Sequence, residues 1–439
     1  MKFRGLIFAL AVLAGLVGAL YWSNQHKPAD TVQASVDTSP KILAFKAGNI
    51  TTLDLKKKGA PEISLAKNAS GQWEIMSPQR LDADQSAVSG MLSTLSSLDG
   101  DRLVEEKAAD LSQFGLSAPA LEVDVAGKGN SVHELLIGDE TPTSSGSYAK
   151  VASDPRVFTI ATYTKTNIDK GVNDLRDKRL LRFEPDKVVR LDLNANQQQI
   201  EFGRNKDQWE ILKPKPLRAN GFTVDDLVSK LSQAKMNLSA FDEKKAESAF
   251  ASGKPVASAT VTTDSGTESL QLRKQKDSYY AKSSLVPGVY SVGGDLGDAL
   301  NKKLDDFRNK KLFDFGYVDP DKIEIHAGDK TYFLTKGGDD WFSADGKKLD
   351  AVHAQSVVDK VRDLDATKFA NSGFSAPSLS LIVTSNSGKR VEKVQIAKDS
   401  NDYLAKRQDD PSLYVLDKST VDELEKAAND LKPAVPKKS

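Results

Sequence analysis

Two Ser-x-x-Lys sequences are the first residues in this chain whose spacing could support a reaction. They occupy residues 64–67 and 147–150, and in penicillin-recognising enzymes the same spacing supplies a nucleophilic serine and its lysine. That chemistry requires the motif to open a helix, so that the two side chains lie one turn apart. Both copies here lie in strand-like stretches, and no Lys-Thr-Gly sequence accompanies them. We therefore predict that they are ordinary strand residues.

Other catalytic and metal-binding patterns are equally incomplete. Residues 314–316 read Asp-Phe-Gly, the metal-binding triplet of kinases, but neither a His-Arg-Asp loop nor a glycine-rich phosphate loop accompanies them. The four histidines are scattered, without the close pairing of a metal site. The absence of cysteine excludes disulfides, thiol catalysis and thiolate metal sites. These patterns favour a non-enzymatic protein with no catalytic residue, no cofactor and no metal.

The composition is that of an electrically neutral globular protein. The 439 residues are enough for about three domains of roughly 150 residues each. The 61 basic and 61 acidic residues cancel, so the chain has no electrostatic reason to bind nucleic acid. Its apolar content of 39% and charged content of 28% are ordinary for a globular protein.

The first 22 residues have the pattern of a targeting or membrane segment. Lys2 and Arg4 precede residues 5–22, which carry no charge and almost reach the length of about 20 residues needed to cross a bilayer. Basic residues remain on the cytoplasmic side. We therefore expect a single-pass inner-membrane protein with the bulk of the chain in the periplasm. The alternative is secretion after cleavage of this segment.

The elements that would position any site occur three times along the chain. Trp73, Trp209 and Trp341 are separated by 136 and 132 residues. A proline follows them by 46, 46 and 36 residues, and an alternating apolar run typical of a half-buried strand comes next. Each tryptophan ends a hairpin strand, so we expect it in a core rather than in a stacking surface for a glycan or peptide.

Each copy reads as two strands, a helix, several strands and a second helix. Short turns between the strands indicate antiparallel neighbours. The predicted fold is α+β: three tandem homologous domains, each an antiparallel sheet with helices on one face, after an N-terminal transmembrane helix. The expected boundaries are a signal anchor or transmembrane helix at 1–22, a polar tether at 23–40, repeat domains at 41–181, 182–313 and 314–431, and a disordered tail at 432–439.

The first two copies end in a shared basic sequence at residues 176–181 and 308–313, which predicts the end of a closing helix. The third copy lacks it and has no domain after it, so the sequence belongs to the domain junctions. Its basic side chains could bind phosphate or an acidic partner, although helix C-termini also favour basic residues and a solvated basic face is common. The candidate interaction residues are Arg176, Lys178, Arg179, Arg308, Lys310 and Lys311.

Taken together, these motifs resemble the bacterial DUF4340 family. The resemblance rests on the N-terminal anchor, the Trp-Glu-Ile and proline strand pair, and the repeated basic closing sequence, and it covers roughly residues 41–430. It implies an envelope protein similar to the auxiliary subunits of ABC-2 type transporters of the gliding-motility type. It implies no catalytic residues.

We therefore expect a membrane-anchored, envelope-facing, non-enzymatic accessory or scaffold protein. The expected partners are the inner membrane, through residues 5–22, and an ABC-type permease and its ATPase. The alternative is a module that binds glycan or another cell-wall polymer in clefts between its domains, where tandem copies would add avidity.

Overall fold

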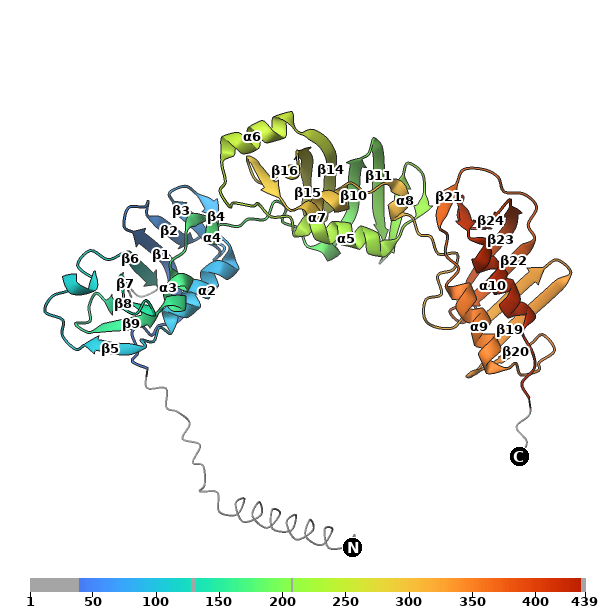
Figure 1. The fold of residues 1–439 in the computed structure, drawn as a ribbon, viewed down its shortest axis with the longest axis horizontal. Coiled ribbons are helices and arrows are strands. Elements are labelled where there is room, and N and C mark those ends of the chain that lie inside the picture. The colour runs from blue at the N-terminus through green and yellow to red at the C-terminus, as the bar shows by residue number, and fades with distance from the viewer. Residues whose placement is uncertain (1–38, 128–131, 207, 436–439) are drawn as a thin grey trace, which may run out of the picture. The chain divides into compact units, whose positions relative to one another are not determined.

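The computed structural model describes residues 39–127, 132–206 and 208–435. Within them the chain forms three antiparallel sheets with helices, which confirms the predicted α+β fold. The chain divides into two compact units, one that ends at Asp177 and one that begins at Lys178. The first unit holds one sheet and the second unit holds the other two (Figure 1).

The first sheet has nine strands in the order β4-β3-β2-β1-β6-β7-β8-β9-β5. Its helices α2 and α3 contact each other. The strands are β1 (Ile50–Lys57), β2 (Ile63–Lys67), β3 (Trp73–Ser77), β4 (Leu81–Asp82), β5 (Arg102–Glu105), β6 (Leu121–Gly127), β7 (Val132–Glu140), β8 (Gly146–Val151) and β9 (Val157–Ala161). The helices are α2 (Gln85–Ser96), α3 (Thr162–Ile168) and α4 (Val172–Leu175), with short 3-10 turns η1 (Ala47–Asn49) and η2 (Ser112–Phe114).

The second sheet repeats this plan with eight strands in the order β13-β12-β11-β10-β14-β15-β16-β17. The strands are β10 (Val188–Ala195), β11 (Gln198–Asn205), β12 (Gln208–Lys213), β13 (Leu217–Arg218), β14 (Lys254–Thr263), β15 (Gly266–Gln275), β16 (Ser278–Ser283) and β17 (Val289–Val292). The helices are α5 (Gly221–Ser232), α6 (Glu243–Ser252), α7 (Gly294–Leu300) and α8 (Leu304–Phe307), after the 3-10 turn η3 (Pro185–Lys187).

The third sheet also has eight strands, in the order β20-β19-β18-β22-β23-β24-β25-β21. The strands are β18 (Lys322–Ala327), β19 (Lys330–Gly337), β20 (Asp340–Phe342), β21 (Lys368–Ala370), β22 (Leu379–Ser385), β23 (Arg390–Asp399), β24 (Asp402–Arg407) and β25 (Leu413–Leu416). The helices α9 (Ala351–Arg362) and α10 (Lys418–Asn429) contact each other.

Alternation along the central strands explains why one face of each sheet is covered. In β1, Leu53 and Leu55 are buried, whereas Asp54 between them is only half-buried. Successive side chains in a strand point to opposite faces, so one face becomes apolar and the other polar. Helices α2, α5, α6 and α9 begin at acidic or amide caps, such as Asp84 before α2 and Asn220 before α5, whose side chains accept hydrogen bonds from backbone N–H groups. The described residues form three large hydrophobic cores, one for each sheet, and a small fourth cluster around Phe114 in the first unit.

Two expectations require correction. The basic sequences at 176–181 and 308–313 do not end a helix: α4 ends at Leu175 and α8 at Phe307, and extended backbone follows each. Each sequence carries chain from one core to the next, which needs length rather than helical turns. Helices also do not all lie on one face, because α6 packs against Arg273, whose neighbour Leu272 points into the core on the other side.

The predicted roles of the tryptophans and the Ser-x-x-Lys sequences agree with the structure. Trp73, Trp209 and Trp341 are buried in the three cores. Residues 64–67 lie in β2 and residues 147–150 in β8, where strand geometry places serine and lysine far from a one-turn separation.

The predicted membrane segment at residues 5–22 lies outside the described residues, as does most of the tether at 23–40. Among the residues that the structure describes, no helix is long and apolar enough to cross a membrane.

The core assignment predicts a large difference between two phenylalanines of the second unit. Phe307 is fully buried and packs on Phe202, with ring centroids 5.0 Å apart, whereas Phe222 is 91% exposed. We expect Phe307→Ala to lower the free energy of unfolding by about 3–5 kcal/mol through loss of burial and creation of a cavity. The same change at Phe222 should cost no more than about 0.5 kcal/mol. Calorimetric unfolding would measure both, and equal losses would contradict the assignment.

Candidate functional site

The two junction segments, residues 176–181 and 308–313, each pair with backbone at both ends. In the second segment, Arg308 forms a β-bridge with Ala219 and Lys311 forms one with Asp365. The first segment repeats this pattern, with Arg176 bridged to Ala83 and Arg179 bridged to Lys235, each within its own unit. Both segments finish with two buried apolar residues of the following core: Leu180 and Leu181, then Leu312 and Phe313.

The basic side chains of the second segment are engaged within the protein. The guanidinium of Arg308 lies 3.3 Å from the ring centroid of Phe369 and pairs with Asp305 at 2.9 Å. Lys310 donates to the backbone carbonyl of Thr367 at 3.1 Å, although most of its side chain is exposed. Burial raises the pKa of Asp365 above its ordinary range, and the charge of Lys311 partly opposes this shift. The cations therefore stabilise the passage between the two cores.

The three predicted residues of the first segment differ from one another in exposure. Arg176 is buried, Lys178 is half-buried and Arg179 is exposed. Arg176 belongs to the first unit, and Lys178 and Arg179 belong to the second. The neighbouring Arg182 donates its backbone N–H to Glu268 of β15 at 2.6 Å.

The polar network around the second segment, which we call the joint, begins with Arg218 of β13. Its guanidinium pairs with Asp314, directly after the segment, and donates to the carbonyl of Lys311 at 2.7 Å. It also reaches the hydroxyl of Tyr414 on β25, at 3.1 Å. One side chain from the second sheet thus contacts the junction segment and a strand of the third sheet. The joint comprises Arg218, Asp314, Arg390, Glu392, Arg407 and Tyr414.

Buried charges continue the joint inside the third domain. Glu392 accepts the backbone N–H of Asp314 at 3.1 Å and pairs with Arg390 and Arg407, each at 3.1 Å. Arg407 is only 1% exposed; it also pairs with Asp409 at 2.8 Å and donates to the carbonyl of Leu312. Burying a charge is costly unless it is paired and hydrogen-bonded, and here both conditions are met.

The environment of the joint shifts its acid–base behaviour. Burial raises the pKa of Tyr414 to about 12, with Arg218 opposing the shift and Asp410 adding to it. Burial opposes the ionisation of Asp409, yet its bond to Arg407 outweighs this and holds the pKa of that carboxyl below its ordinary range. These shifts follow from pairing within the protein. A strongly shifted pKa can indicate a functional site, but structural ion-pair networks produce the same effect.

Sequence reasoning identified none of the six joint residues as part of an interaction site. It singled out the basic residues of the segment, and it considered Asp314, directly after the segment, only as the start of an incomplete kinase-like triplet. Arg407 carried the clearest signal, because it occupies an inward position of β24, in line with the buried Tyr403 and Ala405. A charge at an inward position of a period-two pattern requires a buried partner.

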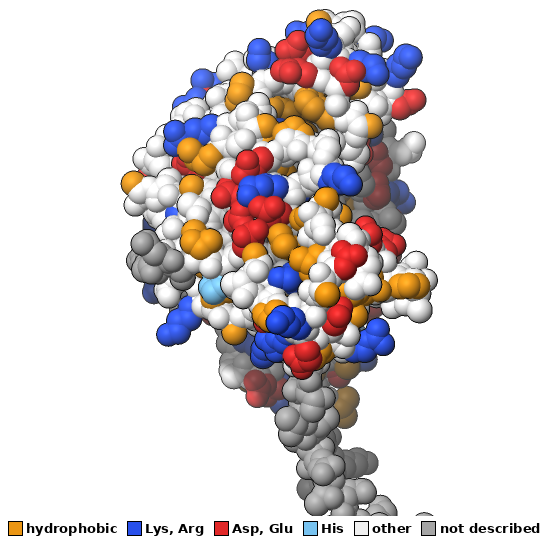
Figure 2. All heavy atoms as spheres, turned by 90° about the vertical axis from the view of Figure 1, so that its left-hand side faces the viewer, with side chains coloured by type: hydrophobic (Ala, Val, Ile, Leu, Met, Phe, Trp, Pro, Cys, Tyr) orange, Lys and Arg blue, Asp and Glu red, His pale blue; other side chains and the backbone are white. Residues whose placement is uncertain are grey.

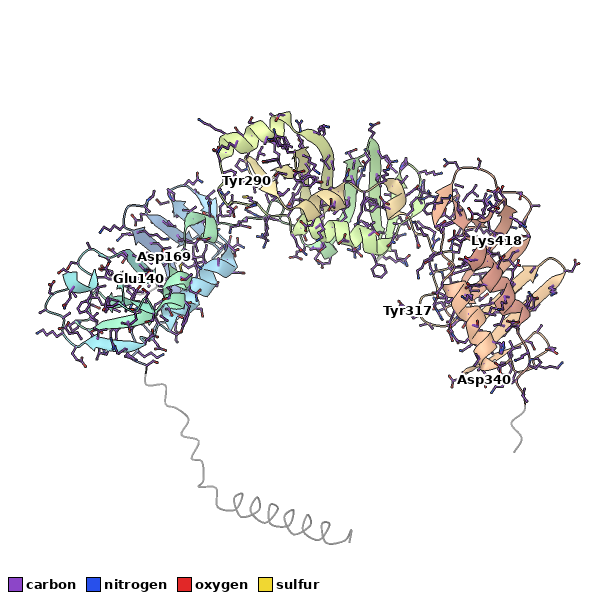
Figure 3. All side chains as sticks on the ribbon, viewed as in Figure 1. Glu140, Asp169, Tyr290, Tyr317, Asp340 and Lys418 are labelled. Atoms are coloured by element: carbon purple, nitrogen blue, oxygen red, sulfur yellow. The ribbon has the colours of Figure 1, made fainter. Side chains whose placement is uncertain are left out.

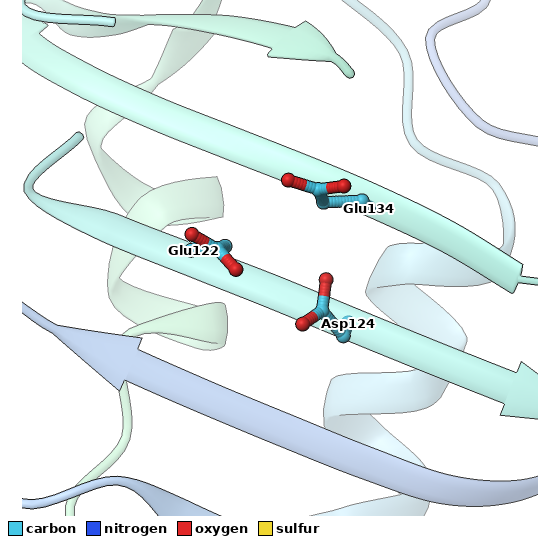
Figure 4. Close-up of side chains that lie close together, drawn as sticks. All are labelled: Glu122, Asp124 and Glu134. Atoms are coloured by element: carbon cyan, nitrogen blue, oxygen red, sulfur yellow. The ribbon is translucent and has the colours of Figure 1, made fainter. Parts of the chain in front are cut away.

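A second group of charges lies on the polar face of the first sheet. Glu122 and Asp124 on β6 and Glu134 on β7 bring carboxylate oxygens within 4.8 Å of one another (Figure 4). Lys56 of β1 pairs with Glu122 at 2.5 Å and with Asp124 at 2.7 Å, which raises its pKa well above the ordinary value. Figure 2 shows acidic side chains gathered around a basic one on a face of this unit. Lys56 therefore already neutralises two of these three carboxylates, Glu122 and Asp124.

Two grooves lie elsewhere in the described residues. The larger, about 770 Å³, lies at the end of the second sheet where β10 turns into β11. The smaller, about 360 Å³, lies at the matching end of the third sheet, where β18 turns into β19. Neither is lined by a residue of a junction segment.

Comparison with known proteins identifies the family. The model of a domain of unknown function, DUF4340, matches residues 73–249 and again residues 209–381. The chain belongs to the DUF4340 family. Each match begins at a hairpin tryptophan and contains one complete junction segment, so the family unit extends from one folded domain into the next. No curated protein and no solved structure matches the chain.

The buried charges of the joint predict a large effect on stability. Arg407→Met removes the cation from a buried pair: the carbonyl of Leu312 loses its guanidinium donor, and Glu392 keeps only Arg390 as an ion-pair partner. We expect the free energy of unfolding to fall by about 3–5 kcal/mol. Lys406→Met, on the same strand and exposed, is the matched control and should change it by at most about 0.5 kcal/mol. Denaturant unfolding of both variants would measure this, and a neutral Arg407→Met would contradict the role given to the pair.

The raised pKa of Tyr414 predicts a loss of stability in alkali. Because the folded state holds this proton more tightly than the unfolded state, its contribution is complete below the ordinary value of 10.0 and disappears as the pH rises towards about 12. Two pKa units correspond to about 2–3 kcal/mol. The difference in unfolding free energy between the wild type and Tyr414→Phe should therefore shrink between pH 10 and 12.

The control for this measurement is Tyr317→Phe, the same change at a residue that is 98% exposed and points away from the ribbon in Figure 3. A difference for Tyr414→Phe that stays constant from pH 9 to 12 would contradict the proposed linkage.

Proposed function

We propose that this DUF4340 protein is a non-enzymatic accessory or scaffold protein of the cell envelope, anchored in the inner membrane by residues 5–22 with its repeats on the outer side of that membrane. In this proposal it serves as an auxiliary component of an ABC-2 type transporter. The partners are the membrane itself and the permease and ATPase of that transporter.

The location of the buried charged residues is the observation that best supports a scaffold role. In the described residues, the paired and buried Glu392 and Arg407 belong to the joint between the second and third sheets, and neither lines one of the two grooves. Enzymes arrange perturbed charges around a cavity that admits substrate. Here Glu392 and Arg407 hold the end of the junction segment, at Asp314 and Leu312, in the third domain, and Arg218 ties that segment to the second sheet. A scaffold with a fixed spacing between binding surfaces requires such a connection.

Exposed apolar side chains close to the joint offer a surface for such a partner. Tyr317 and Val318 follow the joint residue Asp314 within a few positions and are 98% and 79% exposed. Large exposed aromatics are enriched in protein interfaces, where they bury much area at little cost in conformational entropy. These exposed side chains therefore provide a surface, close to the joint, for the partner contact that we propose.

The topology in this proposal comes from the sequence. Lys2 and Arg4 precede the uncharged residues 5–22, and basic residues near a membrane segment stay on the cytoplasmic side. The described residues 39–435 would then lie beyond the membrane. The absence of cysteine fits an exported protein that avoids oxidisable thiols.

Partner capture in cells tests the proposal. The full chain with a C-terminal tag would be crosslinked in intact cells, solubilised, purified, and its co-purifying proteins identified. We expect enrichment of a transporter permease and its ATPase. We also expect Arg218→Glu to reduce this enrichment severalfold, because it places like charges opposite Asp314 at the joint.

Arg190→Glu is the matched control, because Arg190 lies on the polar face of the same sheet, paired with Asp192 at 3.0 Å and away from the joint. It should retain the partners. Recovery of the chain alone, or of wall material without membrane proteins, would argue against the transporter assignment.

A further inference from the structure

The groove at the end of the second sheet contains an ordered row of uncharged polar side chains. In the strand register, Asn194 of β10 lies opposite Gln199 of β11 on one side and opposite Ser258 of β14 on the other. Ser258 in turn lies opposite Gln271 of β15. Directly paired residues share a face of the sheet. Asn194 and Ser258 share a hydrogen bond of 3.4 Å, which agrees with this placement. The row therefore crosses four neighbouring strands, and all four side chains line the groove.

The polar side chains that line this groove are mainly amides. Seven of its sixteen lining residues are asparagine or glutamine, and none is acidic. In the described part of the chain, the side chains of Gln199 and Gln271 form no hydrogen bond with another residue and stand exposed. Each amide can donate and accept at the same time. The groove volume of about 770 Å³ lies within the range of ordinary ligand sites.

The same row has different chemistry in the other two repeats. In the first sheet the positions of Asn194 and Ser258 are held by Lys56 and Glu122, which form an ion pair at 2.5 Å. In the third sheet they are held by His326 and Ser380, and neither of these residues lines the smaller groove. The scaffold is shared, yet only the second repeat presents a row of amides.

One cation is fixed at an end of this groove on the same face as the amide row. Arg273, two residues after Gln271, donates to the carbonyls of Phe250 and Ala251 at the end of α6, at 3.1 and 3.3 Å, and lines the groove. Lys274 points to the opposite face of the sheet, where its Nζ lies 5.0 Å from the ring centroid of Tyr279. At the opposite side, Asn196 donates to the carbonyl of Asn301 at 2.8 Å and so ties the β10–β11 turn to the end of α7.

We propose that this groove binds a glycan chain. Sugar hydroxyl and acetamido groups both donate and accept hydrogen bonds, as the amides of the row do, and a carboxylate on the glycan would lie at the Arg273 end. A bare phosphate site would need its cations at the centre, and an extended peptide would pair with a sheet edge rather than lie across its face. This site lies within the second repeat, not in a cleft between domains. It is independent of the proposed transporter role.

The test is a calorimetric titration of the purified full chain with two probes, a neutral N-acetylglucosamine oligomer and a soluble disaccharide-peptide from peptidoglycan. We expect saturable binding of at least one. The double variant Asn194→Ala/Gln271→Ala should weaken it about tenfold or more, because two hydrogen-bonding side chains are lost. Tighter binding of the acidic probe, reduced by Arg273→Met, would place its carboxylate at the cationic end.

The matched control is Gln395→Ala, which occupies the position of Gln271 in the third sheet, opposite Ser380. It should leave binding unchanged. All variants change exposed or half-exposed side chains, and an unaltered melting temperature would confirm that they fold. The absence of binding to both probes, or binding that the double variant retains in full, would overturn the proposal. Partner capture with the double variant would remain intact, which separates this result from a failure of the transporter assignment.

Discussion

The structure of the second unit depends on one constraint: the chain must pass from one core to the next within a few residues and leave no backbone polar group unpaired. Phe307 belongs to the second core and Leu312 to the third. Between them the chain finds partners first at Ala219 and then at Asp365. A flexible linker would solve the problem by exposure to water. This chain solves it by pairing, so the position of each core constrains the other.

The same kind of junction connects repeats whose sheets differ in their outward-facing side chains. Inward positions in the middle of the paired strands β1 and β6, β10 and β14, and β18 and β22 are leucine, isoleucine, valine or alanine, because each core must pack against its helices. Outward positions are free of that demand. The first sheet places an ion-paired cluster there, the second a row of amides, and the third a mixture with histidine. Repetition therefore supplies a common frame, and differences in chemistry between repeats are where distinct functions can arise.

The repeat, the antiparallel sheets and the buried tryptophans could all be predicted from sequence, because hydrophobic periodicity and the spacing of Trp73, Trp209 and Trp341 reflect local rules. The path of the junction segments could not. Helix and extended backbone are both compatible with a run such as Arg-Asn-Lys-Lys-Leu-Phe, and the choice is made by edge partners about 55 to 90 residues away in the chain, such as Asp365 and Ala219. The joint was hidden for the same reason, since Arg218 and Tyr414 are 196 residues apart.

The joint is built from charged groups rather than from apolar contacts, and this choice has a physical reason. Apolar residues of similar size often stabilise a protein as well as a buried ion pair does, but they accept many packing arrangements. Arg218 can satisfy its guanidinium only when Asp314, the carbonyl of Lys311 and the hydroxyl of Tyr414 are all in reach. A slipped or rotated third domain would separate Arg218 from Asp314, the carbonyl of Lys311 and the hydroxyl of Tyr414, whereas the Glu392–Arg407 pair would persist because it lies within the third domain. The contacts of Arg218 therefore favour one arrangement of the second and third repeats, and a scaffold of the kind proposed above would gain more from that specificity than from additional stability.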